Sequence, residues 1–322
     1  MKILYGVQST GNGHITRSSK IVQRLSKSGC RVDIITSGNN SKVNFPFPIK
    51  YNFKGLTLYY DGEGQIDYWK TFKELRLLHL MRDVKLDISS YDLIISDFEP
   101  ISAWAAKFQD KVSVGISNQY SFLSKNTPRP IDKNVVGEFL LKWMAPVKHP
   151  IGLHFEPYDN FIKTPILRDN IYNFEINNKG HYTVYLSNWS CNNIIQYLKP
   201  IQYKFEIFTD VKRPVRYGNC FLKPVDKSLF DESLKNCMGV ITAGGFQTCA
   251  ESLFLNKELI VIPIKNQYEQ LCNVESLKRM GVKTGNINEI NTLLNLPRTQ
   301  KNVFWQDPTE QIVQEILNLG IK

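Results

Sequence analysis

The sequence predicts an α/β protein made of two similar halves, each built around a parallel sheet. The first observation is at the N-terminus, where an apolar strand (2–7), a glycine loop, a helix (15–28) and a second strand (31–36) follow one another. This order is a βαβ unit, whose right-handed crossover makes the two strands parallel. The second observation is that the same order recurs over residues 239–263. The third is the length of 322 residues, which corresponds to about two domains.

The remaining elements of the first half continue this alternation. Residues 92–97 read DLIISD, an apolar run typical of a buried strand, and residues 111–116 read KVSVGI, a second strand. Between them, the sequence predicts a short helix over 100–109 that carries Trp104. The first half therefore contains at least four strands with helices between them.

The segment 59–84 differs from its surroundings. It opens with the turn-rich run YYDGEGQ and then places large apolar side chains at helical spacing, with basic side chains mostly on the other faces. One interpretation is a core-facing helix with a solvated basic side. The other is an element that binds the acceptor or faces a membrane.

The second half repeats the alternation of strands and helices. The sequence predicts a helix over 248–255 and strands over 181–186, 204–208, 239–242 and 259–263. Residues 308–319 follow as an amphipathic helix.

The boundary between the halves is predicted within 149–178. Pro150, Pro157 and Pro165 interrupt any regular element there. The predicted units are an N-terminal α/β domain, a C-terminal α/β domain and a final helix, with the bounds 1–160, 161–306 and 307–322.

Composition narrows the class of protein. Lys and Arg number 40 against 30 Asp and Glu, so the net charge is +10 and an anionic partner is favoured: nucleic acid, an acidic membrane surface or a phosphorylated substrate. The six cysteines form no CxxC pair, which argues against a zinc site and a disulfide framework. The apolar runs are too short for a membrane span or a signal peptide. We therefore expect a cytoplasmic protein, with peripheral contact at the inner face of the membrane left open.

The N-terminal glycine loop, Gly11-Asn12-Gly13-His14, lies after a predicted strand and before a helix. Glycines at this place let the backbone approach a ligand closely, and a helix N-terminus favours anions. Thr16 interrupts the G-x-G-x-x-G spacing of a dinucleotide site, so NAD is not favoured. His14 stands where α/β proteins bind ligands, and it could take a proton from an acceptor hydroxyl. The alternative is a histidine that satisfies the local backbone.

Two carboxylates, Asp97 and Glu99, end another predicted strand. Either could orient His14 or act as the base. One of them could instead cap the following helix through its exposed N–H groups. Both interpretations stay open at this point.

The strongest motif is ITAGGFQT, which joins a predicted strand to a helix. Paired glycines before a helix N-terminus form a cradle for a diphosphate. Glu251 lies one turn into that helix and could reach ribose hydroxyls, and a polar run after the next strand could bind sugar hydroxyls. The candidate ligand-binding residues of this region are Gly244, Gly245, Phe246, Gln247, Thr248, Glu251, Gln267, Glu269 and Gln270.

These motifs resemble those of GT-B fold glycosyltransferases, in the group of the peptidoglycan N-acetylglucosaminyl transferase and the UDP-glycosyltransferases. The resemblance rests on GNGH (11–14) and on residues 241–273, and SDFEP (96–100) is similar to a poorly characterised microbial branch. It implies two Rossmann-like domains that face a cleft. The donor would lie mainly against the C-terminal domain and the acceptor against the N-terminal one, and the last helix would cross back.

The same resemblance implies that Gly244 to Thr248 hold the diphosphate, Glu251 the ribose, and Glu269 and Gln270 the donor sugar. His14 matches the histidine that follows the N-terminal glycine loop. The sequence departs from the plant enzymes, because it lacks their HCGWNS core and their tryptophan platform for uracil. Ala243 also precedes the glycines in place of a serine or histidine, so backbone amides must do more of the anion binding.

The resemblance implies transfer of a sugar from a nucleoside-diphosphate sugar, with a UDP-sugar as co-substrate, to an acceptor hydroxyl. It also implies inversion, no metal and no cofactor. We expect a glycolipid or a precursor of a surface polysaccharide as acceptor. The alternatives are a glycosyltransferase that acts on modified DNA bases, a sugar-nucleotide epimerase of the same fold, an NAD-dependent oxidoreductase, and a sensor that binds a sugar nucleotide without turnover.

Overall fold

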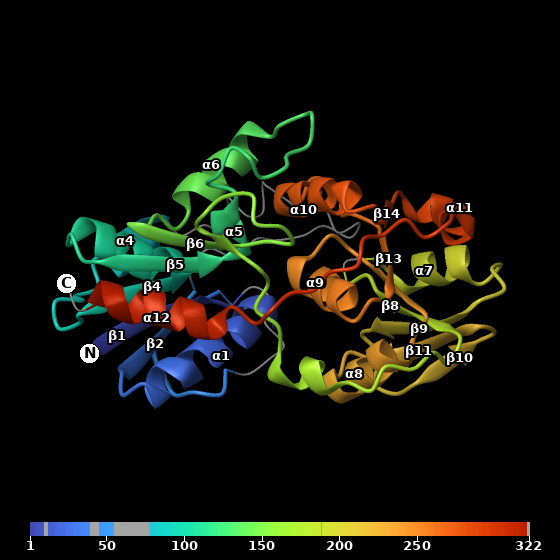
Figure 1. Cartoon of the computed structure of the whole chain (residues 1–322), viewed down its shortest axis with the longest axis horizontal. Coiled ribbons are helices and arrows are strands. Elements are labelled where there is room, and N and C mark those ends of the chain that lie inside the picture. Colours follow the sequence, from blue (N-terminus) through green and yellow to red (C-terminus); the bar gives the residue numbers. More distant parts are fainter. Residues whose placement is uncertain (10–11, 39–44, 55–76, 188, 321–322) are drawn as a thin grey trace.

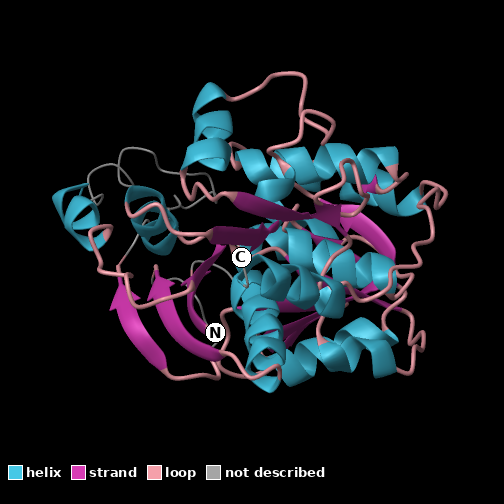
Figure 2. Ribbon diagram, turned by 60° about the vertical axis from the view of Figure 1, so that its left-hand side comes forward, coloured by secondary structure: helices cyan, strands magenta, loops and turns pink. Residues whose placement is uncertain are grey.

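The chain folds into two α/β lobes that lie side by side (Figure 1). The structure is a computed structural model, and it describes residues 1–9, 12–38, 45–54, 77–187 and 189–320. Helices pack around the strands of both sheets (Figure 2). The predicted segment 59–84 lies largely outside the described residues, and its described end forms the short helix α3 (Leu77–Asp83).

The N-terminal sheet has the strand order β3-β2-β1-β4-β5-β6-β7. All of its pairings are parallel, as the βαβ pattern predicts. Its strands are β1 (Lys2–Gln8), β2 (Arg31–Ser37), β3 (Ile49–Phe53), β4 (Leu93–Asp97), β5 (Ser113–Ser117), β6 (His149–Leu153) and β7 (Ile162–Lys163). Besides α3, the helices described in this lobe are α1 (Asn12–Lys27), α4 (Pro100–Phe108), α5 (Asn118–Ser121) and α6 (Val135–Trp143).

The C-terminal sheet has the order β10-β11-β9-β8-β12-β13-β14, and all its pairings except β10 with β11 are parallel. Its strands are β8 (His181–Tyr185), β9 (Lys204–Thr209), β10 (Val215–Tyr217), β11 (Cys220–Pro224), β12 (Gly239–Thr242), β13 (Glu258–Val261) and β14 (Lys283–Thr284). The helices are α7 (Cys191–Leu198), α8 (Lys227–Asn236), α9 (Phe246–Phe254), α10 (Tyr268–Arg279) and α11 (Ile290–Asn295), with 3-10 turns at Asp169–Asn173 and Ile287–Glu289.

Each sheet has one point where the direction of strand succession reverses. In the N-terminal sheet, this point lies between β1 and β4, and in the C-terminal sheet between β8 and β12. Open α/β sheets bind ligands outside the carboxyl ends of the strands at such points, because the connecting helices diverge to opposite faces there. The topology therefore predicts ligand binding near the loops that follow Gln8, Asp97, Tyr185 and Thr242.

The last helix, α12 (Thr309–Gly320), returns to the N-terminal lobe and packs against α1 (Figure 1). Arg24 Nε lies 3.0 Å from Glu310 Oε1, and Lys163 Nζ lies 2.8 Å from Glu315 Oε1. Ile312, Val313 and Ile316 are buried on the apolar side of α12. The predicted fold class, two Rossmann-like units with a crossing C-terminal helix, is confirmed.

One expectation was wrong in detail, because the prolines do not interrupt every regular element within 149–178. The first five residues of this segment form β6, which pairs with β5 even though Pro150 is its second residue. Proline is tolerated near the start of a strand. Gly152 is required further along, since a Cβ there would come within 2.7 Å of the Ser121 backbone. The N-terminal sheet then continues to Lys163, past the predicted bound at residue 160.

Candidate active site

A cavity of about 600 Å³ lies between the two domains, where the two reversal points meet. The N-terminal domain lines it with the start of α1 and with α5, and the C-terminal domain lines it with the start of α9 and the loop before α8. The domains touch at this place, since a Cβ on Gly13 would lie 3.4 Å from the Gln247 Cβ. The lining residues are Gly13, His14, Thr16, Arg17, Asn118, Gln119, Arg168, Tyr185, Val225, Asp226, Lys227, Phe230, Asp231, Gly245, Phe246, Gln247, Thr248, Glu251 and Glu269.

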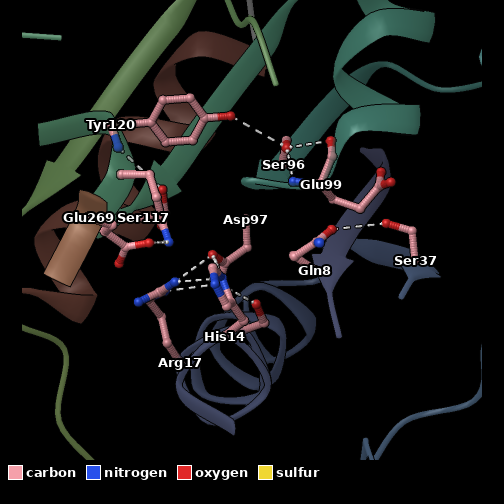
Figure 3. A network of polar contacts seen from close by, with 12 residues as sticks. Gln8, His14, Arg17, Ser37, Ser96, Asp97, Glu99, Ser117, Tyr120 and Glu269 are labelled. Atoms are coloured by element: carbon pink, nitrogen blue, oxygen red, sulfur yellow. Dashed lines mark hydrogen bonds and ion pairs between the residues drawn. The ribbon is translucent and has the colours of Figure 1, made fainter. Parts of the chain in front are cut away.

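On the N-terminal side, Asp97 is the centre of a network of polar contacts (Figure 3). His14 Nδ1 lies 2.7 Å from Asp97 Oδ1, and Ser18 Oγ donates to Oδ2 at 2.7 Å. Arg17 donates from Nε to Asp97 Oδ2 at 2.9 Å and from Nη2 to Asp97 Oδ1 at 2.5 Å. Asp97 ends β4 and the other three residues lie on α1, so the two strands at the reversal point bring the network together.

The charges in this network stabilise one another. Burial raises the pKa of the Asp97 carboxyl, but the positive charge of Arg17 and the hydrogen bonds with His14 and Arg17 outweigh burial, so its pKa lies below the ordinary value. Burial lowers the pKa of Arg17, but the Asp97 charge reverses this and raises it. His14 Nδ1 also lies 3.0 Å from Arg17 Nη2, so its two contacts depend on the tautomer of the ring. In the tautomer that carries the proton on Nδ1, His14 donates a hydrogen bond to the ionised Asp97. The other ring nitrogen, Nε2, is then the acceptor of the neutral imidazole.

The structure places Glu99 in the capping position that the sequence left open. Its Oε1 accepts from the Ile101 N–H at 2.8 Å and its Oε2 from the Ser102 N–H at 2.7 Å, so it caps α4. The side chain is fully buried and is not among the residues that line the cavity. Burial raises its pKa above the ordinary value. Of the two carboxylates proposed from the sequence, only Asp97 contacts His14.

On the C-terminal side, α9 begins at the cavity without a side-chain cap. Its N-cap residue is Gly245, whose lack of a side chain leaves the first N–H groups of the helix without a capping oxygen. The neighbouring helices α7, α8 and α10 are capped by the side chains of Ser190, Asp226 and Gln267. An uncapped helix N-terminus that opens on a cavity is suited to an anion.

The two glycines of the motif do different things. Gly245 lines the cavity, and a Cβ there would meet nothing within 4 Å. Gly244 faces α10 instead, because a Cβ there would lie 2.9 Å from the Gln270 backbone oxygen. The side chain of Asn273 donates to the Gly244 carbonyl at 3.0 Å. Gly244 thus allows close packing of the loop on α10.

Glu251 lines the cavity, but Arg168 already holds its carboxylate. Arg168 donates to Oε1 at 2.8 Å and to Oε2 at 2.7 Å, and Gln247 donates to Oε1 at 3.0 Å. Arg168 also contacts Asp231 at 2.5 Å. A carboxylate has about four acceptor positions, so one position on Oε2 is left for a ligand hydroxyl.

The polar run at the start of α10 contributes only one of its three candidates to the cavity. Glu269 lines it, and Gln119 of the N-terminal domain donates to Glu269 Oε2 at 2.9 Å across the domain boundary. Burial raises the pKa of Glu269. Gln267 caps α10 through its side chain, and Gln270 packs against Gly244, so neither is among the lining residues.

Several lining residues were not among the sequence candidates. Arg17 could have been found, because it lies three residues after His14 and so on the same face of the helix. Tyr185 ends a strand at a reversal point, which is also a usable signal. Its ring and that of Phe230 are 5.7 Å apart and form an aromatic wall. Arg168 lies in the chain segment between the domains, and nothing local marks it.

Two negative observations apply to the described residues alone. None of their helices is both long and apolar enough to cross a lipid bilayer. In the same part of the chain, no cluster of three or more His, Cys, Asp or Glu side chains is placed to hold a metal ion.

Comparisons with known proteins agree with this architecture. The family model described as Glycosyl transferase family 1 matches residues 1–295. Among solved structures, MurG of Acinetobacter baumannii is 12% identical, with a TM-score of 0.56, and the match covers 98% of this chain and 99% of that one. SnogD from Streptomyces nogalater is 13% identical, with a TM-score of 0.53 and coverage of 99% and 96%. Arabidopsis thaliana UGT89C1, complexed with UDP, is 11% identical, with a TM-score of 0.55 and coverage of 98% and 94%. No curated protein matches the sequence.

Two facing Rossmann-like units with a shared cavity and a returning last helix define a GT-B fold enzyme. The chain belongs to Glycosyl transferase family 1 and is a glycosyltransferase.

Proposed function

We propose that the protein transfers a sugar from a nucleoside-diphosphate sugar, most simply a UDP-sugar, to an acceptor hydroxyl, with inversion and without a metal ion or cofactor. One observation carries the proposal. A single cavity joins the His14–Asp97 pair to the uncapped N-terminus of α9. The first can accept a proton, and the second can receive a diphosphate.

In the proposed reaction, His14 Nε2 takes the proton of the acceptor hydroxyl. The hydroxyl oxygen forms a bond to the anomeric carbon while the bond from that carbon to the diphosphate oxygen breaks. The positive charge that develops on the imidazole is stabilised by Asp97, 2.7 Å from Nδ1. The negative charge that develops on the leaving diphosphate is stabilised by the N–H groups from Gly245 to Thr248 and by the dipole of α9.

The other lining residues fit parts of the donor. The remaining acceptor position of Glu251 would receive a ribose hydroxyl, with Arg168 as the residue that orients the carboxylate. The wall of Tyr185 and Phe230 offers an aromatic surface to the nucleobase. Glu269 would accept a hydroxyl of the donor sugar. UDP-sugar as donor agrees with the solved relative that is complexed with UDP, at the level of the shared fold.

We further propose a glycolipid or a precursor of a surface polysaccharide as acceptor, and a cytoplasmic protein with peripheral contact to the inner membrane face. The net charge of +10 supports an anionic surrounding for the acceptor. The acceptor would enter from the N-terminal side, where His14 lines the cavity.

The first test is a thermal-shift panel of UDP, TDP, GDP, CDP and NAD on the full chain. A ligand that binds only the folded state at ~100 times its Kd adds about 2.7 kcal/mol to the free energy of unfolding. We expect a rise in Tm with one nucleoside diphosphate and a smaller rise in Glu251→Ala, with Glu175→Ala, at an exposed position, as matched control. A rise in Tm with NAD alone would contradict the proposed donor, and so would the absence of a rise with every nucleoside diphosphate of the panel.

Turnover then separates the transferase from the alternatives. Release of the nucleoside diphosphate that depends on an added acceptor is expected. Conversion of the sugar nucleotide without any acceptor would instead identify an epimerase.

A further inference from the structure

Helix α6 presents its apolar side to solvent rather than to the protein core. Leu141 is its one buried residue. Val135 is 82% exposed, Phe139 62% and Ile131, in the loop just before the helix, 100%. The apolar α6 face consists of Ile131, Val135, Val136, Phe139 and Trp143, all of them exposed.

The spacing shows that this exposure belongs to one helical face. Positions 135, 136, 139 and 143 fall on one side of an α-helix, because residues three to four apart lie above one another. The opposite side holds the helix in place. Gly137 lies so close to Tyr268 of α10 that a Cβ would come within 2.4 Å of its ring, and the Tyr268 hydroxyl donates to Glu138 at 2.6 Å.

Lysines surround the apolar α6 face. Lys133, two residues after Ile131, and Lys142, within α6, are exposed, and Lys142 and Lys107 each place Nζ about 5 Å from the Trp143 ring. Of the acidic residues nearby, Asp132 is exposed, while Glu138 is paired with Arg129. The face therefore combines apolar side chains with a surplus of positive charge.

We propose that the apolar α6 face docks the protein on an anionic lipid bilayer. Apolar side chains on one face and lysines at its edge are the pattern of helices that lie in the membrane interface. A tryptophan beside lysine ammonium groups suits the level of the lipid headgroups. Charge complementarity selects the occupant, since an anionic lipid surface matches both parts of the face, whereas nucleic acid phosphates match only the lysines.

Helix α6 lies close to the cavity, so docking through α6 would bring a bilayer near the proposed active site. Figure 1 shows α6 at the outer edge of the N-terminal lobe, next to α10. Tyr268, which contacts α6, is followed directly by Glu269, which lines the cavity. A bilayer on the apolar α6 face would lie beside the domain boundary that closes the cavity. The docking names the surface for the peripheral membrane contact of the proposed function and rests on it, whereas the proposed donor site does not depend on the docking.

The test is flotation of the full chain with vesicles of phosphatidylcholine alone and with about one third phosphatidylglycerol. We expect binding to the anionic vesicles, at least tenfold weaker in Phe139→Asp. The matched control is Phe304→Asp, which changes the same residue type at a site that is 90% exposed in the C-terminal crossing segment. The control should bind like the wild type. Lys133→Glu should weaken binding about fivefold or more, since each basic residue near an anionic surface contributes about 1 kcal/mol.

Several results would overturn the proposal. These are no binding of the wild type to anionic vesicles, equal losses in Phe139→Asp and Phe304→Asp, or a dimer in light scattering that Phe139→Asp dissociates, which would make a second copy the occupant. Tight binding of duplex DNA that Lys133→Glu abolishes and Phe139→Asp leaves intact would also contradict it. The nucleoside-diphosphate thermal shift is measured on the same variants. It should persist in all of them, so a failed docking and a failed donor site give different results.

Discussion

The cavity surface at His14 and the cavity surface at Gly245 differ in the groups that they present. In the N-terminal domain, buried charged side chains converge, and the Asp97 carboxylate accepts contacts from His14, Arg17 and Ser18. In the C-terminal domain, a helix begins at Gly245 with no side-chain cap and offers backbone N–H groups. A group that moves a proton must be held in one orientation and one tautomer, which takes specific side chains. A diphosphate spreads its charge over several oxygens, and a helix N-terminus matches that without charged side chains.

The comparison predicts that a single side chain matters most at the N-terminal end. His14→Ala should lower kcat/KM by about 10²–10⁴, the usual contribution of a general base. The thermal shift with the nucleoside diphosphate should change little, because that contact lies in the other domain. Steady-state rates beside thermal shifts provide the check, and near wild-type turnover would remove His14 as the base.

The second prediction concerns stability at the same end. Asp97→Ala leaves the Arg17 guanidinium, 4% exposed, without its partner, and should lower the free energy of unfolding by about 3–5 kcal/mol. Urea unfolding of the variant and the wild type measures this. An unchanged urea midpoint in Asp97→Ala would show that the Arg17–Asp97 ion pair does not stabilise the fold.

The pH dependence sharpens the same prediction. The pKa of Asp97 is lowered in the folded chain relative to its value of about 3.9 in an unfolded one. Its contribution to stability is therefore fully present above pH ~3.9 and is lost as the pH falls through the lower pKa of the folded state. Wild-type stability should thus fall more steeply between about pH 5 and pH 2 than that of Asp97→Asn, which has no carboxyl to protonate at this position.

The C-terminal end is tested by its two neighbouring glycines. Gly244→Ala forces a Cβ against the backbone of α10 and should cost about 1–3 kcal/mol of folding free energy, as overpacked sites do. Gly245→Ala meets no neighbour and should leave stability close to that of the wild type. If the donor diphosphate lies against Gly245, that variant should nevertheless weaken nucleotide binding. Chemical unfolding measures the loss of stability in each variant, and nucleotide titration measures the loss of binding. Equal losses of stability and of binding in the two variants would contradict the separate roles of Gly244 and Gly245.

The smallest effect is expected at Glu99. Glu99→Ala removes the cap of α4 and should cost about 0.5–2 kcal/mol of stability, with little effect on the transfer rate of the folded enzyme. Thermal unfolding and initial rates decide this. A fall in rate comparable with that of His14→Ala would restore Glu99 to the chemistry.

Much of this could be predicted from the sequence because the relevant signals are local. The strands predicted at 2–7 and 239–242, the paired glycines at 244 and 245 and the last helix follow from short runs of residues, and the described part of the chain has them. The sequence also places His14 and Asp97 at the ends of strands, where parallel sheets bind ligands. The start of the segment 149–178 was misjudged because its prolines were expected to interrupt any regular element, whereas residues 149–153 pair with β5 as a strand.

Sequence alone thus determined the fold class, the family motifs and the two loops at which chemistry is expected, since each depends on periodicity or on residue type at fixed spacing. Only the tertiary structure decided which carboxylate serves which purpose. Asp97 and Glu99 are two residues apart, yet one contacts His14 from another element and the other caps its own helix. Arg168 and Glu251 are 83 residues apart and meet only because the chain crosses between domains beside α9. Such contacts depend on how distant segments pack, and no local pattern encodes them.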